Sequence, residues 1–166
     1  MSILDGCPGG CPSGCPAVQD GSVHPDRLSC LEGAGEQYER ALAIGEAALG
    51  PDHPDVAIRR NNLGSVLQDL GDLEGARVQL ERALAIDEAA LGPDHPSVAI
   101  SCHYLGYLLR ELGDLAGARA QYERALAISE AALGPDHPHV AAIRGDLGRV
   151  LQALQNAPPE GPASDL

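Results

Sequence analysis

The chain has 166 residues and a formal net charge of −13. An acidic surface repels nucleic-acid phosphates and anionic lipid headgroups, so we expect neither nucleic acid nor a membrane as a partner. The chain has no Phe, no Trp and only four Tyr, so its core would consist of aliphatic side chains, which favours packed helices over sheets. We therefore expect an all-α fold.

Targeting signals are missing from the sequence. No segment approaches the roughly 18 consecutive apolar residues that a membrane span needs, and the N-terminus lacks the charged and apolar order of a signal peptide. The five Cys do not contradict a reducing compartment, because they lack the spacing of a disulfide framework. These features predict a cytoplasmic protein.

The first 31 residues are rich in Cys, Pro and Gly, and we expect residues 1–31 to be irregular. Cys7, Cys11 and Cys15 recur at four-residue intervals, and thiolates can hold zinc or an iron-sulfur cluster. The interval fits no common metal site well, and a Pro after each Cys favours irregular chain. We expect no metal and no cofactor, and a Cys-rich metal-binding head stays a weaker alternative.

From Glu32 onwards, the sequence repeats itself every 42 residues. The motif LGPDHP occurs three times at this interval, and the segments 71–98 and 113–140 differ at only five of 28 positions. A fixed period of this length is typical of repeat architectures. We expect the repeats to extend over 32–154, followed by a disordered tail at 155–166.

Apolar residues within each period follow two helical stripes. In the longer stripe Leu73, Leu80 and Leu84 share a face, and in the shorter stripe Leu63 and Leu67 do so. Each period therefore predicts one longer and one shorter helix, which form a hairpin. The expected helices are 32–49, 55–69, 73–91, 97–111, 115–133 and 139–154.

The joints between these helices carry turn residues. Gly71 can adopt the left-handed conformation that closes a helix, and Asp72 can cap the next one. In the first LGPDHP motif, we expect Gly50 to end a helix, Asp52 to cap its successor and His53 to bond or pack locally. The three His of this motif should form a row along one edge of the repeat array, too far apart to share a metal ion.

A Gly recurs in the middle of each shorter helix, as Gly64, Gly106 and Gly148. A Gly inside a helix costs about 1 kcal/mol relative to Ala, so its recurrence suggests a steric requirement. We expect the small residues Ala76 and Ala118 of the longer helices to approach these positions closely.

This pattern resembles the tetratricopeptide signature of Leu-Gly, a bulky residue, a Gly turn, and then Ala, bulky, Ala. The residues that carry the resemblance are Leu63, Gly64, Leu67, Gly71, Ala76, Leu80 and Ala83. The 42-residue period, with ERALAI, LGPDHPxVA and NNLG, resembles the kinesin light chain variety of the repeat. Arg provides all 11 basic residues, which favours a GC-rich bacterial source.

The resemblance covers about three quarters of the chain and implies a right-handed α-solenoid of antiparallel helical hairpins. It further implies that the concave face, lined by the shorter helices, binds a peptide or protein partner. Inward positions lie on either side of each Leu-Gly pair. The candidate ligand-binding residues are Asn61, Asn62, Ser65, Gln68, His103, Tyr104, Tyr107, Arg110 and Arg149.

Other functions find little support. No phosphate-binding loop, nucleophile elbow or metalloprotease helix motif is present, so we expect no enzyme. One alternative is a fragment or regulatory piece of a larger signalling ATPase or regulator that contains such repeats. Another is a homo-oligomer formed through repeat ends that no capping helix covers.

Overall fold

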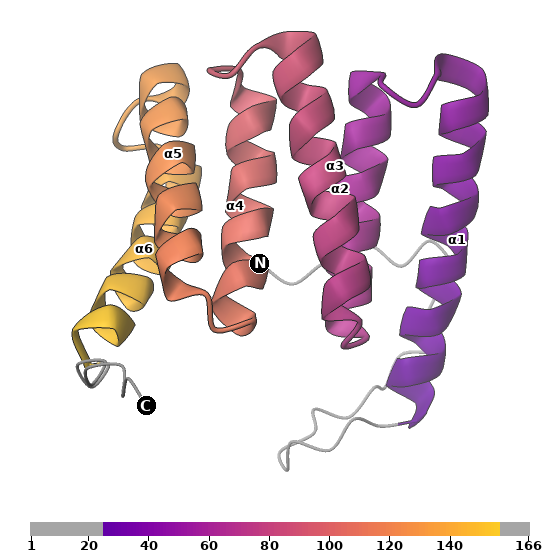
Figure 1. Ribbon diagram of the computed structural model, residues 1–166, viewed down its shortest axis with the longest axis horizontal. Coiled ribbons are helices and arrows are strands. Elements are labelled where there is room, and N and C mark those ends of the chain that lie inside the picture. The colour runs from indigo at the N-terminus through magenta and orange to yellow at the C-terminus, as the bar shows by residue number, and fades with distance from the viewer. Residues whose placement is uncertain (1–24, 157–166) are drawn as a thin grey trace, which may run out of the picture.

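The computed structural model describes residues 25–156, and side chains from Leu31 onwards. This part of the chain contains helices and no strands, which confirms the all-α fold. The helices stand side by side and alternate in direction (Figure 1). They are α1 (Pro25–Leu49), α2 (Pro54–Asp69), α3 (Leu73–Leu91), α4 (Pro96–Glu111), α5 (Leu115–Leu133) and α6 (Pro138–Asn156).

The two outer helix ends differ from the prediction. Helix α1 begins at Pro25, so the expected irregular segment 1–31 is wrong over residues 25–31. The prediction treats Pro25 as a break, although the fixed φ of Pro suits the first turn of a helix. Helix α6 continues to Asn156, two residues into the expected tail. Cys7, Cys11 and Cys15 lie outside the described residues, as do residues 157–166.

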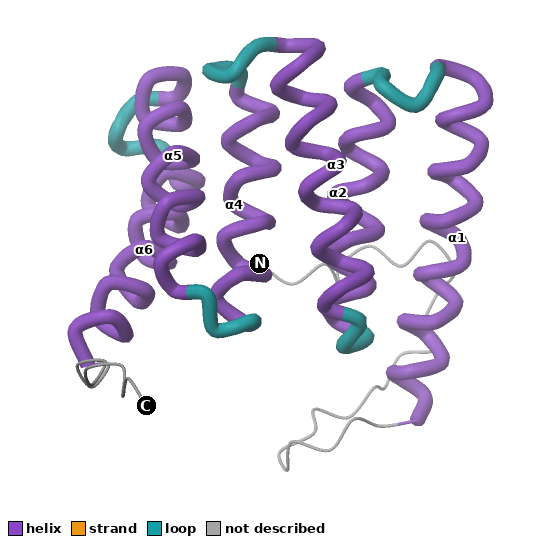
Figure 2. The backbone as a smooth tube through the Cα atoms, viewed as in Figure 1, coloured by secondary structure: helices purple, strands orange, loops and turns teal. Residues whose placement is uncertain are grey.

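The helices form two layers. Within residues 25–156, the backbones of α2 and α4 and those of α4 and α6 lie close together, whereas those of α1, α3 and α5 stay apart. Helices α3 and α5 meet only through long side chains, as in the ion pair between Glu88 and Arg124. Elements on the inside of a curve lie closer together than those on the outside. The shorter-helix layer of α2, α4 and α6 therefore forms the inner face of the array, and short loops join the layers at both ends (Figure 2). None of the described helices has the length and hydropathy to cross a bilayer.

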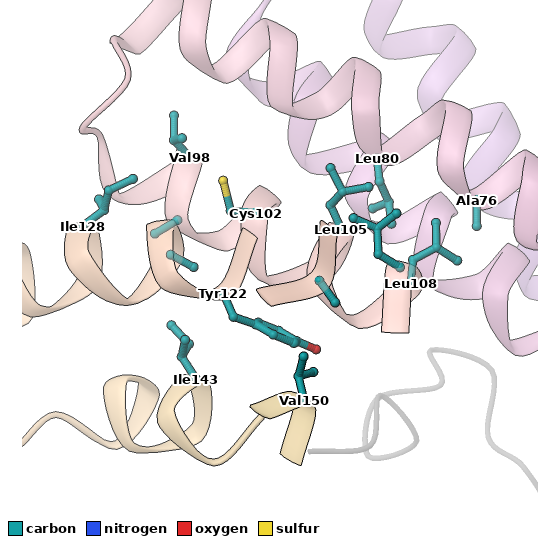
Figure 3. Packing of buried hydrophobic residues seen from close by; sticks show 14 residues of the cluster. Ala76, Leu80, Val98, Cys102, Leu105, Leu108, Tyr122, Ile128, Ile143 and Val150 are labelled. Atoms are coloured by element: carbon teal, nitrogen blue, oxygen red, sulfur yellow. The ribbon is translucent and has the colours of Figure 1, made fainter. Parts of the chain in front are cut away.

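Buried aliphatic side chains fill the space between the layers in two clusters. The larger cluster joins α3, α4, α5 and α6 around Tyr122, which is completely buried. Figure 3 shows the Tyr122 ring lying between α5 and the Ile143 and Val150 side chains of α6. The smaller cluster joins α1, α2 and α3 around Leu42, Val56 and Leu63.

The recurrent helical Gly lies at a close approach of two helices in two of the three repeats. A Cβ atom on Gly64 would lie 2.8 Å from Leu80 Cγ, and one on Gly106 would lie 2.9 Å from Tyr122 Cε1. Both distances are well below normal contact, which confirms the steric requirement at these two positions. At Gly148 no atom lies within 4 Å of such a Cβ, so the expectation is wrong there: no described helix covers this side of α6.

The turns after the shorter helices α2 and α4 have the predicted cap residues, whereas the LGPDHP turn after each longer helix uses a different cap from the predicted one. Gly71 has a φ of +85°, and Asp72 caps α3 by accepting a hydrogen bond from Gly75 N at 3.0 Å. In the LGPDHP turn, however, His53 is the N-cap, because its Nδ1 accepts from Asp55 N at 3.1 Å. The Pro that follows occupies the first helical position, so the residue before it must be the cap.

We expect His95→Ala to lower the free energy of unfolding by about 1 kcal/mol, the usual cost of losing an N-cap. His95 caps α4 by accepting from Ser97 N at 3.1 Å. The substitution His95→Asn should retain most of the stability, since Asn is a good N-cap. Urea unfolding followed by circular dichroism checks both variants, and equal destabilisation by Ala and Asn would contradict the capping role.

Candidate functional site

The candidate residues lie along the inner face, in register between successive hairpins. Because the period is 42 residues, Ser65, Tyr107 and Arg149 occupy the same place on α2, α4 and α6. Helix geometry therefore places the predicted site residues in parallel rows across three neighbouring helices. Their surroundings differ from helix to helix, and they do not form a single cluster.

On α2 the candidates are largely tied to neighbouring side chains. Asn61 is only 5% exposed, and its Nδ2 donates to Ser101 Oγ at 2.8 Å. Gln68 Nε2 donates to Glu111 Oε2 at 2.6 Å and so links α2 to α4. Asn62 and Ser65 are half-buried. Helix α2 thus offers a ligand fewer free polar groups than the pair of Asn predicts.

On α4 the candidates include an exposed aromatic side chain and a guanidinium in contact with it. Tyr107 is 40% exposed, and the guanidinium carbon of Arg110 lies 4.4 Å from the centre of its ring. This distance is typical of a cation-π contact, which holds the two side chains together on the surface. Tyr104, one turn earlier, is half-buried.

A polar network joins α4 to α6 beside this pair. Asp146 lies between His103 Nε2, at 2.9 Å, and the guanidinium of Arg149, at 2.6 Å, and Arg110 lies 3.9 Å from it. Asp146 is an inward position that the prediction does not single out. The neighbouring His139 has a pKa lowered by burial and then by the nearby His103 and His137.

Comparison with known proteins agrees with this architecture. A sequence profile for the tetratricopeptide repeat matches residues 27–89, 60–131 and 100–159. The chain belongs to the tetratricopeptide repeat family. The three matches overlap and together cover residues 27–159, as expected of a repeating array. No curated protein sequence matches the chain.

Among the solved structures that resemble this tetratricopeptide array are proteins of the kinesin light chain type. One consists of nearly identical TPR-like repeats from Podosopora anserina, with 28% identity and a TM-score of 0.71 over 76% of this chain and 60% of that one. Another is BtubC (BKLC) from P. vanneervenii, with 26% identity and a TM-score of 0.60 over 85% of this chain and 64% of that one. The chain thus spans less than two thirds of either relative. These structures confirm the kinesin light chain-like type.

Sequence reasoning missed a buried carboxylate beneath the inner face of the tetratricopeptide array. Asp87 on α3 is 2% exposed, and Ser101 Oγ donates to its Oδ2 at 2.6 Å. Burial raises the pKa of Asp87, and the Ser101 hydrogen bond and His95 oppose that rise. The sequence held a signal for this residue, because Asp87 follows Leu80 by seven positions and so falls on the apolar stripe.

Metal ligands and reactive thiols are not gathered in the described part of the array. No group of three or more His, Cys, Asp or Glu in residues 25–156 could hold a metal ion. Cys102 is completely buried, and burial raises the pKa of its thiol to about 11. The thiol is therefore protonated at neutral pH and packs as a small apolar group.

Proposed function

We propose that the inner face of this array binds an extended peptide segment of a partner protein. Tetratricopeptide repeats generally mediate protein-protein interactions, and the array is a scaffold of that kind. The observation that carries the proposal is the contact between Tyr107, which is exposed on the middle helix of the inner face, and the half-buried Arg110. Tyr and Arg, together with Trp, are enriched at binding hot spots.

Differences between the repeats support the same face. Among the inner rows, Ser65, Tyr107 and Arg149 differ in all three hairpins, while the segments that form the longer helices are nearly identical. The backbone frame is therefore shared, and each hairpin presents different chemistry to a ligand. The polar network around Asp146 holds Arg149 and His103 in place between α4 and α6.

A peptide display selection on the full chain tests this proposal. The selected peptides are measured by isothermal titration against wild type, Tyr107→Ala and Arg110→Ala. We expect each substitution to weaken binding at least tenfold, because truncation of a hot-spot residue typically costs about 2 kcal/mol or more.

The chain provides a matched control on its outer layer. Val78 is 60% exposed on α3, and Arg77 lies next to it on the same exposed surface. Val78→Ala and Arg77→Ala remove side chains of the same general kinds and should leave the peptide affinity within twofold. Equal losses on the two layers, or a selection that yields no peptide, would count against the inner face as the binding site.

The alternative assignments remain predictions. The metal-binding head concerns residues outside the described range. The homo-oligomer and the regulatory piece of a larger signalling ATPase both require a surface that another element covers, and the exposed side of α6 at Gly148 is such a surface. Light scattering on the purified chain checks self-association directly.

A further inference from the structure

A cavity of about 200 Å³ lies between two inner helices, with α3 beneath it. The share of liquid volume taken by one water is about 30 Å³, so the cavity has room for the end of a long side chain. We call it the α2–α4 pocket. Its lining residues include Ile58, Asn61, Asn62, Asp87, Ile100 and Tyr104.

The free polar atoms of this pocket are hydrogen-bond acceptors, which suit a ligand that donates hydrogen bonds. Asn61 donates to Ser101, and Ser101 donates to Asp87, so the hydrogens of this buried chain all point toward the carboxylate. Two buried atoms remain without a partner, Asn61 Oδ1 and Asp87 Oδ1, and both are acceptors. An unpartnered buried carboxylate oxygen is costly, and a cation with several N–H groups is the ligand that removes the cost.

The repeats show that the fold itself does not require this carboxylate. The 16-residue segments 39–54, 81–96 and 123–138 are identical except at one position, which is Gly45, Asp87 or Ser129. The cavity one repeat further on contains Ser129 at the place of Asp87. Only the middle copy thus carries a charge at this position, and that copy is the one that faces the α2–α4 pocket.

We propose that the α2–α4 pocket binds the cationic end of a Lys or Arg side chain in the partner peptide, with Asp87 as its counter-charge and Asn61 Oδ1 as a second acceptor. This inference rests on the proposed function, because the pocket opens on the inner face. The Lys and Arg side chains both have an apolar stem and a charged tip. The stem matches Ile58 and Ile100 at the pocket, and the tip matches the acceptors below.

Entry to the pocket requires a small movement of side chains. Asp87 Oδ1 is closed off from water, so the cation reaches it by displacing the side chains above. Ile58 and Ile100 are 54% and 44% exposed, and exposed side chains change rotamer readily. The acidic net charge of the chain favours the approach of cationic peptides over anionic ones.

A nuclear magnetic resonance titration of the isotope-labelled full chain tests the proposal without a known partner. The probes are n-butylammonium and n-butylguanidinium, which represent the Lys and Arg ends, and neutral n-butanol. We expect saturable shifts of the Asn61 side-chain amide and of the Asp87 and Ser101 backbone amides with a cationic probe. The neutral alcohol should bind at least tenfold more weakly, and the tighter cation identifies the preferred side chain.

The decisive variant is Asp87→Asn, which removes the charge and keeps the shape. It should weaken the cationic probe at least tenfold, while Asp136→Asn, which removes a charge from an exposed turn, should leave the affinity unchanged. If Asp87→Asn does not fold, Asp87→Ser replaces it, since the third repeat folds with Ser129 there. Equal binding of butanol, an unaffected Asp87→Asn variant, or no response to either cation would overturn the proposal.

The two proposals fail in different ways. If selected peptides depend on Tyr107 and Arg110 but bind Asp87→Asn as tightly as wild type, the inner face is the site and the pocket is not used. If no peptide is selected while butylammonium still binds through Asp87, the proposed function fails and the cation pocket stands on its own.

Discussion

Gly106→Ala is expected to destabilise the array by about 2 kcal/mol, within the usual cost of overpacking a core. The new Cβ would lie 2.9 Å from Tyr122 Cε1 and 3.0 Å from Cδ1. Because the Tyr122 ring is completely buried, it has no open space into which to move. This loss outweighs the gain of up to about 1 kcal/mol that Ala has over Gly in a helix.

The Gly-to-Ala change at Gly148, one repeat further on, is the control, because its effect on stability should have the opposite sign. A Cβ at Gly148 meets nothing within 4 Å, and the residue is exposed. Gly148→Ala should therefore stabilise the protein by about 0.5 to 1 kcal/mol through helix propensity alone. Urea unfolding of both variants measures the difference, and a shift of the same sign for both would show that the Tyr122 contact does not limit the site.

Asp87→Asn is expected to stabilise the protein at pH 7, by on the order of 2 kcal/mol, because it removes a buried charge that has no cationic partner. The effect should depend on pH with a definite sign. Burial raises the pKa of Asp87 in the folded state above that of the unfolded chain. Stability from this group is therefore fully present below the unfolded pKa of about 3.9 and is lost as the pH rises through the folded pKa.

The advantage of Asp87→Asn should thus be smallest below about pH 4 and should grow as the pH rises, until Asp87 is ionised in both states. Thermal unfolding of wild type and variant from pH 3 to pH 7 measures this. The control is Asp136→Asn on an exposed turn, whose stability difference should stay small throughout. A constant advantage of Asp87→Asn over the whole range would contradict the assignment of a raised pKa. If Asp87→Asn both stabilises the protein and weakens cation binding, then the wild-type array is less stable because it keeps the Asp87 carboxylate as a binding group.

The helical hairpins follow from local patterns, which is why the sequence predicts them well. Leu63 and Leu67 repeat at helical spacing, Gly71 ends a helix by its positive φ, and Asp72 caps the next. Each of these effects depends on residues within one or two turns of the chain. The His53 cap is equally local. The prediction chose Asp52 instead, although the position of Pro54 at the start of the helix points to the residue directly before it.

The site residues were less predictable because their state depends on contacts between repeats. The Asn61 to Ser101 bond joins residues 40 positions apart, and the Ser101 to Asp87 bond crosses from α4 to α3. The pattern of a single helix does not show which residues of the neighbouring helices lie opposite it. The family pattern placed Asn61 on the inner face, but only the packing of three helices shows that its Nδ2 is already occupied.

The separation of α1, α3 and α5 from one another has a mechanical consequence. Neighbouring hairpins are joined where an inner helix packs on its neighbours, while the backbones of the described outer helices stay apart and the ion pair between Glu88 and Arg124 links α3 to α5. A change of curvature is therefore resisted mainly by the packing around the inner helices, and on the outer side only by flexible polar side chains such as Arg124 and Glu88. We therefore expect the array to bend easily, so that the radius of curvature of its inner face can adjust to the thickness of a bound partner.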